Sequence, residues 1–203
     1  MKKSMKKLRK AVPMVVVLLA IAAYMTGCGA SDKKDTASGT TDSAAESKDA
    51  AAGAKEEAAE EASFGTFTTV DLDGQAVTQT VFKDAKVTMV NVWGTFCGPC
   101  INEMPDLGAL AAEYKDKELQ IIGIPIDVSE EKNEDTARDI VQQTGADYVH
   151  MLPSEELNKN ILSGVQVVPT TIFVDQDGKV KNVYTGARSK DDWMKIMDEE
   201  LGQ

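Results

Sequence analysis

The 203-residue sequence has only three cysteines and one histidine, which limits the metal chemistry available to it. A structural zinc site takes four ligands, drawn mainly from cysteine and histidine. Cys97 and Cys100 could supply half of such a site, but only Cys28 and His150 remain to complete it. We therefore expect no metal site.

Basic residues are also scarce, with 22 Lys and Arg against 33 Asp and Glu and a net charge of −11. Six of the basic residues lie in a predicted N-terminal signal without acidic residues. The rest of the chain therefore has 16 basic and 33 acidic residues, or −17. A chain of this charge is repelled by nucleic-acid phosphates and by anionic lipids. We expect neither nucleic-acid binding nor membrane binding by charge alone.

No apolar run reaches the ~20 residues that a membrane-spanning helix needs. An apolar run over residues 11–25 follows the six basic residues of positions 1–10. A basic segment followed by a short apolar one is typical of a secretory signal. We interpret residues 1–27 as such a signal, with a transmembrane anchor as the alternative. Export would place the chain where thiols tend to oxidise.

Residues 28–63 lack aromatic and large aliphatic side chains. Such a segment cannot bury enough apolar surface to offset the entropy of ordering it. We expect a disordered linker with an end-to-end distance of ~30 Å, which gives the domain reach. The folded domain is expected over residues 64–203.

A C-x-x-C pair, Cys97 and Cys100, stands between two apolar patterns. The run Val87–Val92 predicts a strand covered on both faces, and apolar residues recur at helical spacing over Ile101–Tyr114. Cys97 is therefore expected at a helix N-terminus, where free N–H groups and the helix dipole favour a thiolate. Because the thiolate is the reactive species in disulfide exchange, redox chemistry is the leading interpretation, and an inert structural disulfide is the alternative.

Two motifs resemble one protein family. The first is V-N-V-W-G-T-F-C-G-P-C, continued by I-N-E-M-P over Ile101–Pro105, and the second is Val167–Asp175. They are similar to the active-site strand and helix, and to the cis-proline loop, of the membrane-anchored TlpA/ResA-like thiol-disulfide reductases. The resemblance covers Phe64–Leu201. It implies an α/β, thioredoxin-like fold with an N-terminal β-hairpin and a central insertion at about residues 129–152.

The resemblance implies roles for both cysteines. Cys97 would be the nucleophile and Cys100 the resolving thiol, and the two would pair as a redox-active disulfide. The dipeptide Gly98-Pro99 between them matches that of reducing thioredoxins. We therefore expect a reduction potential near thioredoxin's ~−270 mV rather than the ~−120 mV of a strong oxidant.

The same resemblance implies a client-binding surface. Pro169 would follow a cis peptide bond, and Val168 would offer backbone hydrogen bonds to an extended client segment. Gly98 and Pro99 would belong to this surface. Phe96 is expected as an apolar rim for docking partners, whereas Trp93 is expected to pack in the core.

Asn91 stands where thioredoxin has a buried aspartate that helps deprotonate the resolving cysteine. Asp127 or Glu130, near the predicted insertion, could supply a carboxylate instead, although solvated loop acids are an equal alternative. Glu103 is expected to be a charge on the first turn of the helix. We expect a structural or surface role for His150.

The segment Met25-Thr26-Gly27-Cys28 is similar to the bacterial lipoprotein box, in which cleavage precedes a cysteine that is then lipidated. This interpretation leaves no cysteine unassigned, because Cys97 and Cys100 pair with each other. We expect a lipid-anchored protein at the cell membrane that faces away from the cytoplasm.

Together these observations predict a monomeric reductase that needs no cofactor and acts on disulfides of exported proteins. Apocytochrome c, in cytochrome c maturation, and oxidised methionine sulfoxide reductase are possible clients. The family implies a membrane electron donor of the CcdA/DsbD type. A disulfide oxidase or isomerase on the same fold is the alternative, and a copper chaperone that uses Cys97 and Cys100 is a weaker one.

Local patterns predict the remaining elements of the domain. They are a hairpin over 64–81 with a turn at Asp73-Gly74, strands over 119–128, 148–152, 170–174 and 179–184, helices over 133–144 and 156–162, and a last helix capped by Ser189 and ending at Leu201.

Overall fold

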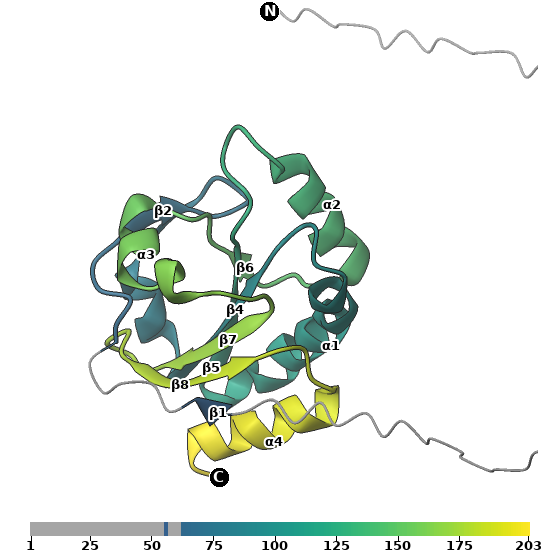
Figure 1. The fold of residues 1–203 in the computed structure, drawn as a ribbon. Helices are drawn as coiled ribbons and strands as arrows, with labels where there is room; N and C mark the ends of the chain where they lie inside the picture. Colours follow the sequence, from purple (N-terminus) through teal and green to yellow (C-terminus); the bar gives the residue numbers. More distant parts are fainter. Residues whose placement is uncertain (1–54, 57–61) are drawn as a thin grey trace, which may run out of the picture. The chain divides into compact units, whose positions relative to one another are not determined.

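The computed structural model describes residues 55–56 and 62–203, which centre on a six-stranded mixed sheet (Figure 1). The strand order is β1-β8-β7-β4-β5-β6. Strands β4, β5 and β6 are parallel, whereas β7, β8 and β1 join by antiparallel pairing. The strands are β1 Lys55–Glu56, β4 Val87–Trp93, β5 Leu119–Pro125, β6 Val149–His150, β7 Thr170–Val174 and β8 Val180–Thr185.

A separate hairpin and the helices complete the fold. The hairpin pairs β2 (Thr68–Val70) with β3 (Ala76–Thr78) in antiparallel register. The α-helices are α1 Gly98–Tyr114, α2 Glu134–Thr144, α3 Glu155–Asn160 and α4 Lys190–Leu201, and the 3-10 helices are η1 Gln79–Asp84, η2 Lys115–Lys117 and η3 Leu162–Gly164. The predicted thioredoxin-like α/β fold with an N-terminal hairpin is confirmed.

Strand β4 is buried along its whole length because both faces of the sheet are covered. On one face, Val87 and Met89 pack with side chains of α1 and α4. On the other face, Val90 and Val92 pack with the hairpin, η1 and α3. Figure 1 shows α1 and α4 together on one side, and α3 with the hairpin on the other.

A third apolar cluster lies where β4 runs into α1. It contains Trp93, Cys97, Cys100 and Met104 together with Ala137 of α2. Helix α2, from the predicted insertion, therefore packs at the end of the sheet that carries the cysteine pair.

The sheet begins earlier in the sequence than expected. Lys55 and Glu56 form β1, which pairs with Tyr184 and Val183 of β8. The N–H of Val180 donates to the carbonyl of Ala62 at 2.9 Å. The sheet therefore includes residues that precede the predicted domain start at residue 64. Composition did not reveal β1 because an edge strand can be held by backbone hydrogen bonds alone.

Several N-terminal predictions lie outside the described residues. These are the signal at 1–27, lipidation of Cys28, and most of the linker. Within residues 55–56 and 62–203, no helix combines the length and the apolar character needed to cross a membrane.

Strand β5 is shorter than the predicted 119–128 and ends at Pro125. The N–H of Val128 donates to the carbonyl of Pro125 at 3.2 Å, which closes a turn after the strand. This turn contains Asp127, whose carboxylate binds Thr95 in the turn before Cys97.

Candidate active site

The cysteine pair lies where the chain leaves β4 and enters α1. A turn, closed by the Cys97 N–H donating to the Gly94 carbonyl at 3.0 Å, joins the two elements. Cys97 and Cys100 form a disulfide with an S–S distance of 1.97 Å and a Cα–Cα distance of 5.3 Å. Cys97 is 6% exposed and Cys100 is fully buried, so any partner meets Cys97 first.

Cys97 is the N-cap residue of α1. Its Sγ atom accepts a hydrogen bond from the backbone N–H of Cys100 at 3.2 Å. The first turn of the helix carries no acidic residue. Free N–H groups and the positive end of the helix dipole therefore face this sulfur, and they would stabilise a thiolate after reduction.

The loop before β7 lies beside the disulfide. The Val168–Pro169 peptide bond is cis, as the sequence resemblance predicts. Val168 packs against the apolar cluster that contains both cysteines. Thr170, the first residue of β7, is paired with Val92 near the end of β4, and this pairing brings the loop to the site.

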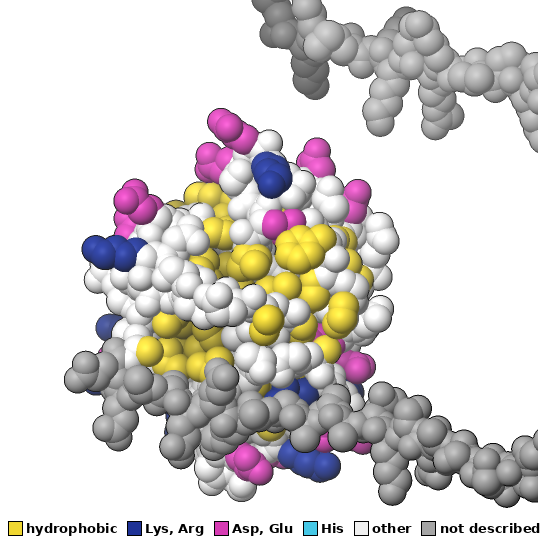
Figure 2. Space-filling view, in the orientation of Figure 1, with side chains coloured by type: hydrophobic (Ala, Val, Ile, Leu, Met, Phe, Trp, Pro, Cys, Tyr) yellow, Lys and Arg dark blue, Asp and Glu magenta, His cyan; other side chains and the backbone are white. Residues whose placement is uncertain are grey.

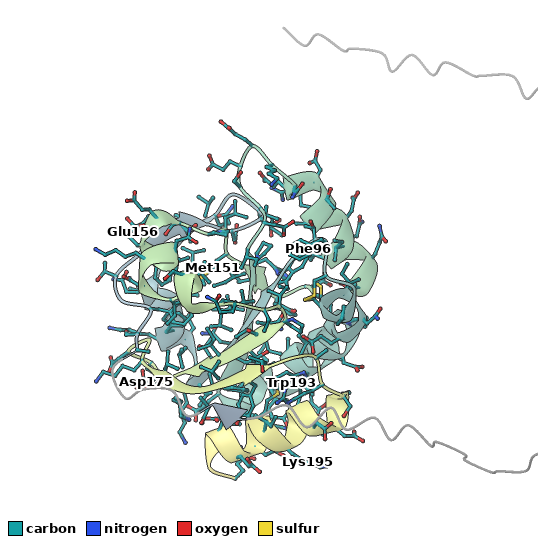
Figure 3. The ribbon with its side chains drawn as sticks, in the orientation of Figure 1. Phe96, Met151, Glu156, Asp175, Trp193 and Lys195 are labelled. Carbon is teal, nitrogen blue, oxygen red and sulfur yellow. A yellow bond between two sulfur atoms is a disulfide. The ribbon has the colours of Figure 1, made fainter. Side chains whose placement is uncertain are left out.

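Exposed groups surround Cys97. Phe96 is 70% exposed, Val167 is 55% exposed, and Gly98 and Pro99 are also exposed. Figure 2 shows apolar side chains gathered on this face of the molecule, and Figure 3 shows Phe96 near the disulfide. The structure thus places the predicted rim residue Phe96 in solvent next to the reactive sulfur.

Trp93 and His150 are both core residues. The Trp93 indole N–H donates to Nδ1 of His150 at 3.3 Å, and Nε2 of His150 bonds the Ala146 carbonyl at 2.9 Å. Burial lowers the pKa of His150 to about 4, so the ring is neutral near pH 7. Gly123 leaves room for it, because a Cβ there would lie 2.1 Å from Nδ1 of His150. The expected packing role of Trp93 is confirmed, and His150 is structural rather than a surface residue.

Glu103 is not the first-turn helix charge that the sequence suggested, because the first turn of α1 carries no acidic residue. It is only 4% exposed and stands one turn after Cys100 on α1. Asn91 Nδ2 donates to its Oε1 at 3.1 Å, while the Arg188 N–H and the Trp193 indole N–H donate to its Oε2 at 3.2 and 3.4 Å. Burial raises the pKa of Glu103, and these three hydrogen bonds act in the opposite direction.

Neither of the two carboxylates proposed from the sequence stands where Glu103 does. Asp127 accepts hydrogen bonds from the backbone N–H and the hydroxyl of Thr95, in the turn before Cys97. Glu130 is exposed. The buried carboxylate that accompanies Asn91 thus comes from α1 rather than from the region of the insertion.

A model of the Redoxin family matches residues 53–201, nearly three quarters of the sequence. The chain belongs to the Redoxin family. It is similar to the thiol-disulfide oxidoreductase ResA of Halalkalibacterium halodurans, with 30% identity over 124 residues that cover 61% of this chain and 67% of that protein. ResA of Bacillus thuringiensis subsp. konkukian is 32% identical over 126 residues, covering 62% and 69%.

Solved structures agree with this assignment. A thiol:disulfide interchange protein of the thioredoxin family from Chlorobium tepidum TLS superposes with a TM-score of 0.59 at 26% identity, covering 71% of this chain and 99% of that one. A DsbF homologue from Corynebacterium diphtheriae gives 0.58 at 26% identity, covering 71% and 92%. This Redoxin-family member is a TlpA/ResA-like thiol-disulfide oxidoreductase.

Sequence reasoning missed the surroundings of Glu103. The sequence signal was the E-x-P triplet Glu103-Met104-Pro105, which gives no indication of burial. Trp193 packs in the apolar cluster between α1 and α4, and its indole N–H also donates to the carboxylate. The partners Arg188 and Trp193 lie 85 and 90 residues further along the chain, so no local pattern connects them to Glu103.

Glu103→Gln is expected to remove a pH-dependent loss of stability. The pKa of Glu103 is raised above its ordinary value of 4.5 in the folded protein, so the folded state binds this proton more tightly than the unfolded state. The resulting stabilisation is complete below the unfolded pKa and is lost as the pH rises through the folded pKa. Glutamine does not ionise, so the stability of the variant relative to wild type should increase across that window.

Denaturant unfolding of the oxidised protein at several pH values from about 4 to about 8 measures this difference. Glu113→Gln, which changes a partly exposed carboxylate on the same helix, is the matched control. A difference between Glu103→Gln and wild type that stays constant with pH would contradict the expectation.

Proposed function

We propose that this oxidoreductase acts as a reductant of disulfides in exported proteins. The observation that carries the proposal is the asymmetry of the pair: Cys97 caps α1 and keeps 6% of its surface exposed, whereas Cys100 is fully buried one turn behind it. An accessible nucleophile backed by a sequestered thiol suits two-step dithiol exchange. The dipeptide Gly98-Pro99 supports the reducing direction, because reducing thioredoxins carry the same pair.

In the first step, the Cys97 thiolate attacks one sulfur of a client disulfide. The bond between the client sulfurs breaks as a Cys97–client disulfide forms, and the second client sulfur leaves as a thiolate that takes up a proton. In the second step, the Cys100 thiolate attacks Sγ of Cys97 and releases the first client sulfur. Two electrons thereby pass to the client, and the Cys97–Cys100 disulfide remains.

Glu103 is proposed to accept the proton of Cys100 before the second step. The two residues are three positions apart on α1, so they are neighbours on the helix surface. The raised pKa of Glu103 makes it a stronger base than an exposed carboxylate. Asn91, which cannot act as a base, would hold the Glu103 side chain in place through its hydrogen bond.

The location and the electron supply are proposed from the sequence. The signal over 1–27 and the lipoprotein-like Cys28 support a lipid-anchored protein outside the cytoplasm, where oxidised clients accumulate. Exported thiol proteins such as apocytochrome c or methionine sulfoxide reductase are the proposed clients. The oxidised pair must then regain two electrons from a dithiol, and a membrane donor of the CcdA/DsbD type is the proposed source.

Glu103→Gln should slow the second step roughly 100-fold, because a positioned general base contributes about that factor or more. Stopped-flow measurements that separate formation of the mixed disulfide from its resolution provide the readout. Formation, which uses Cys97, should change little. Glu113→Gln should leave both steps unchanged, and wild-type resolution kinetics in Glu103→Gln would rule out the proposed base.

Cys100→Ser should leave Cys97 joined to its clients in living cells, because the resolving attack is lost. Non-reducing electrophoresis followed by mass spectrometry would identify the adducts, which should appear in the membrane fraction. Cys97→Ser combined with Cys100→Ser should trap nothing. Adding Cys28→Ala should release the adducts from the membrane fraction. A complete absence of thiol-sensitive adducts for Cys100→Ser would count against the exchange mechanism.

The direction of electron transfer is tested by the reduction potential of the Cys97–Cys100 pair, titrated against a defined thiol buffer. A value near ~−270 mV is expected for a reductant, whereas a value near ~−120 mV would identify a disulfide-forming catalyst. The second result would replace the proposed function with the oxidase alternative.

A further inference from the structure

Asp127 makes contacts that the exchange chemistry does not require. Its carboxylate accepts the backbone N–H of Thr95 at 2.9 Å through Oδ1 and the Thr95 hydroxyl through Oδ2. Both oxygens therefore bind one residue, which lies in the turn from Gly94 to Cys97. A carboxylate with two donors from one residue fixes both the position and the rotation of that turn.

Asp127 is also hydrogen-bonded to the start of helix α2. Asn133, the N-cap residue of α2, donates from Nδ2 to the backbone carbonyl and to Oδ2 of Asp127, each at 3.0 Å. Its backbone lies in the left-handed region, with φ at 61°, and its side chain does not cap its own helix. Asn133 thus forgoes the usual N-cap bond and directs its side chain to Asp127 instead.

Two exposed apolar side chains flank this pair, one on each segment. Phe96 follows Thr95 and is 70% exposed, and its ring lies against Gly94, where a Cβ would be 2.7 Å from it. Ile126 precedes Asp127 and is 36% exposed, and its N–H donates to the Trp93 carbonyl at 2.9 Å. We call Phe96 and Ile126 the apolar rim; Phe96 is labelled in Figure 3.

We propose that Asp127 is a positioning residue for client recognition, which holds the two parts of the apolar rim together as one docking surface beside Cys97. The inference rests on the proposed action on protein disulfides. The partner that fits is a protein segment with apolar side chains next to its disulfide. A small disulfide contacts only the sulfur of Cys97 and gains little binding energy from the apolar rim.

The test compares two disulfides with the purified, full-length chain under a fixed dithiol supply. Insulin serves as the protein disulfide and hydroxyethyl disulfide as the small one. Asp127→Asn should raise KM for insulin about 10-fold, the scale of one lost hydrogen bond to a charged group, with a much smaller change in kcat. The ratio of kcat/KM between insulin and hydroxyethyl disulfide should fall by a similar factor.

Three further variants make the test specific. Glu131→Gln removes a nearby exposed charge and should leave the ratio unchanged. Asp127→Asn added to Phe96→Ala should raise KM by much less than it does alone, because both changes act on the same rim. Thr95→Val is a milder change that serves if Asp127→Asn folds poorly. It should raise KM for insulin and should change kcat/KM for hydroxyethyl disulfide to a smaller degree.

Equal losses of kcat/KM on insulin and on hydroxyethyl disulfide in Asp127→Asn and Thr95→Val would overturn this inference. Additive effects of Asp127→Asn and Phe96→Ala on KM for insulin would do the same. Both results would leave the proposed function standing. Wild-type protein that turns over hydroxyethyl disulfide but not insulin would overturn both the inference and the proposed action on protein disulfides.

Discussion

The burial of one carboxylate, that of Glu103, constrains how the rest of the domain is assembled. Removing a charged or polar group from water is costly unless partners satisfy it. Here the partners come from β4 (Asn91), from the segment before α4 (Arg188) and from α4 itself (Trp193). The same side chain that stands one turn behind Cys100 therefore ties α1 to the central strand and to the C-terminal helix. One buried group therefore links packing to the proposed chemistry at Cys100.

The cysteine pair is held from two further directions. On one side, β7 pairs with β4 so that the Val168–Pro169 loop packs against the cluster containing both cysteines. On the other, Asp127 connects the turn before Cys97 to the start of α2. Elements that are distant in sequence thus meet at a single strand-to-helix junction. This arrangement leaves Cys97 6% exposed and holds the groups around it in place, which suits the proposed exchange with protein disulfides.

The fold and the reactive pair could be predicted from the sequence because their signals are local. The apolar run before the C-x-x-C pair marked β4, and Ser189 marked the start of α4. Long-range features were not predictable in this way. Strand β1 depends on backbone pairing with β8, and the burial of Glu103 depends on donors 85 and 90 residues away. Asp127 was identified as a candidate, but its true partner, Thr95, lies 32 residues earlier in the chain.

The central strand carries Asn91 where thioredoxin has an aspartate. This difference has a physical reason, because Glu103 is hydrogen-bonded to Asn91. Two neighbouring buried carboxylates repel each other, so one of them would be forced to keep a proton. An amide carries no charge and can either donate or accept a hydrogen bond. Asn91 Nδ2 donates to Oε1 of Glu103, an arrangement that suits an ionised carboxylate, while Oδ1 of Asn91 is buried without a partner among the described residues. Rotating the amide would present that oxygen to a protonated Glu103. A strand asparagine can therefore support both protonation states of a helix glutamate without adding a second buried charge beside it.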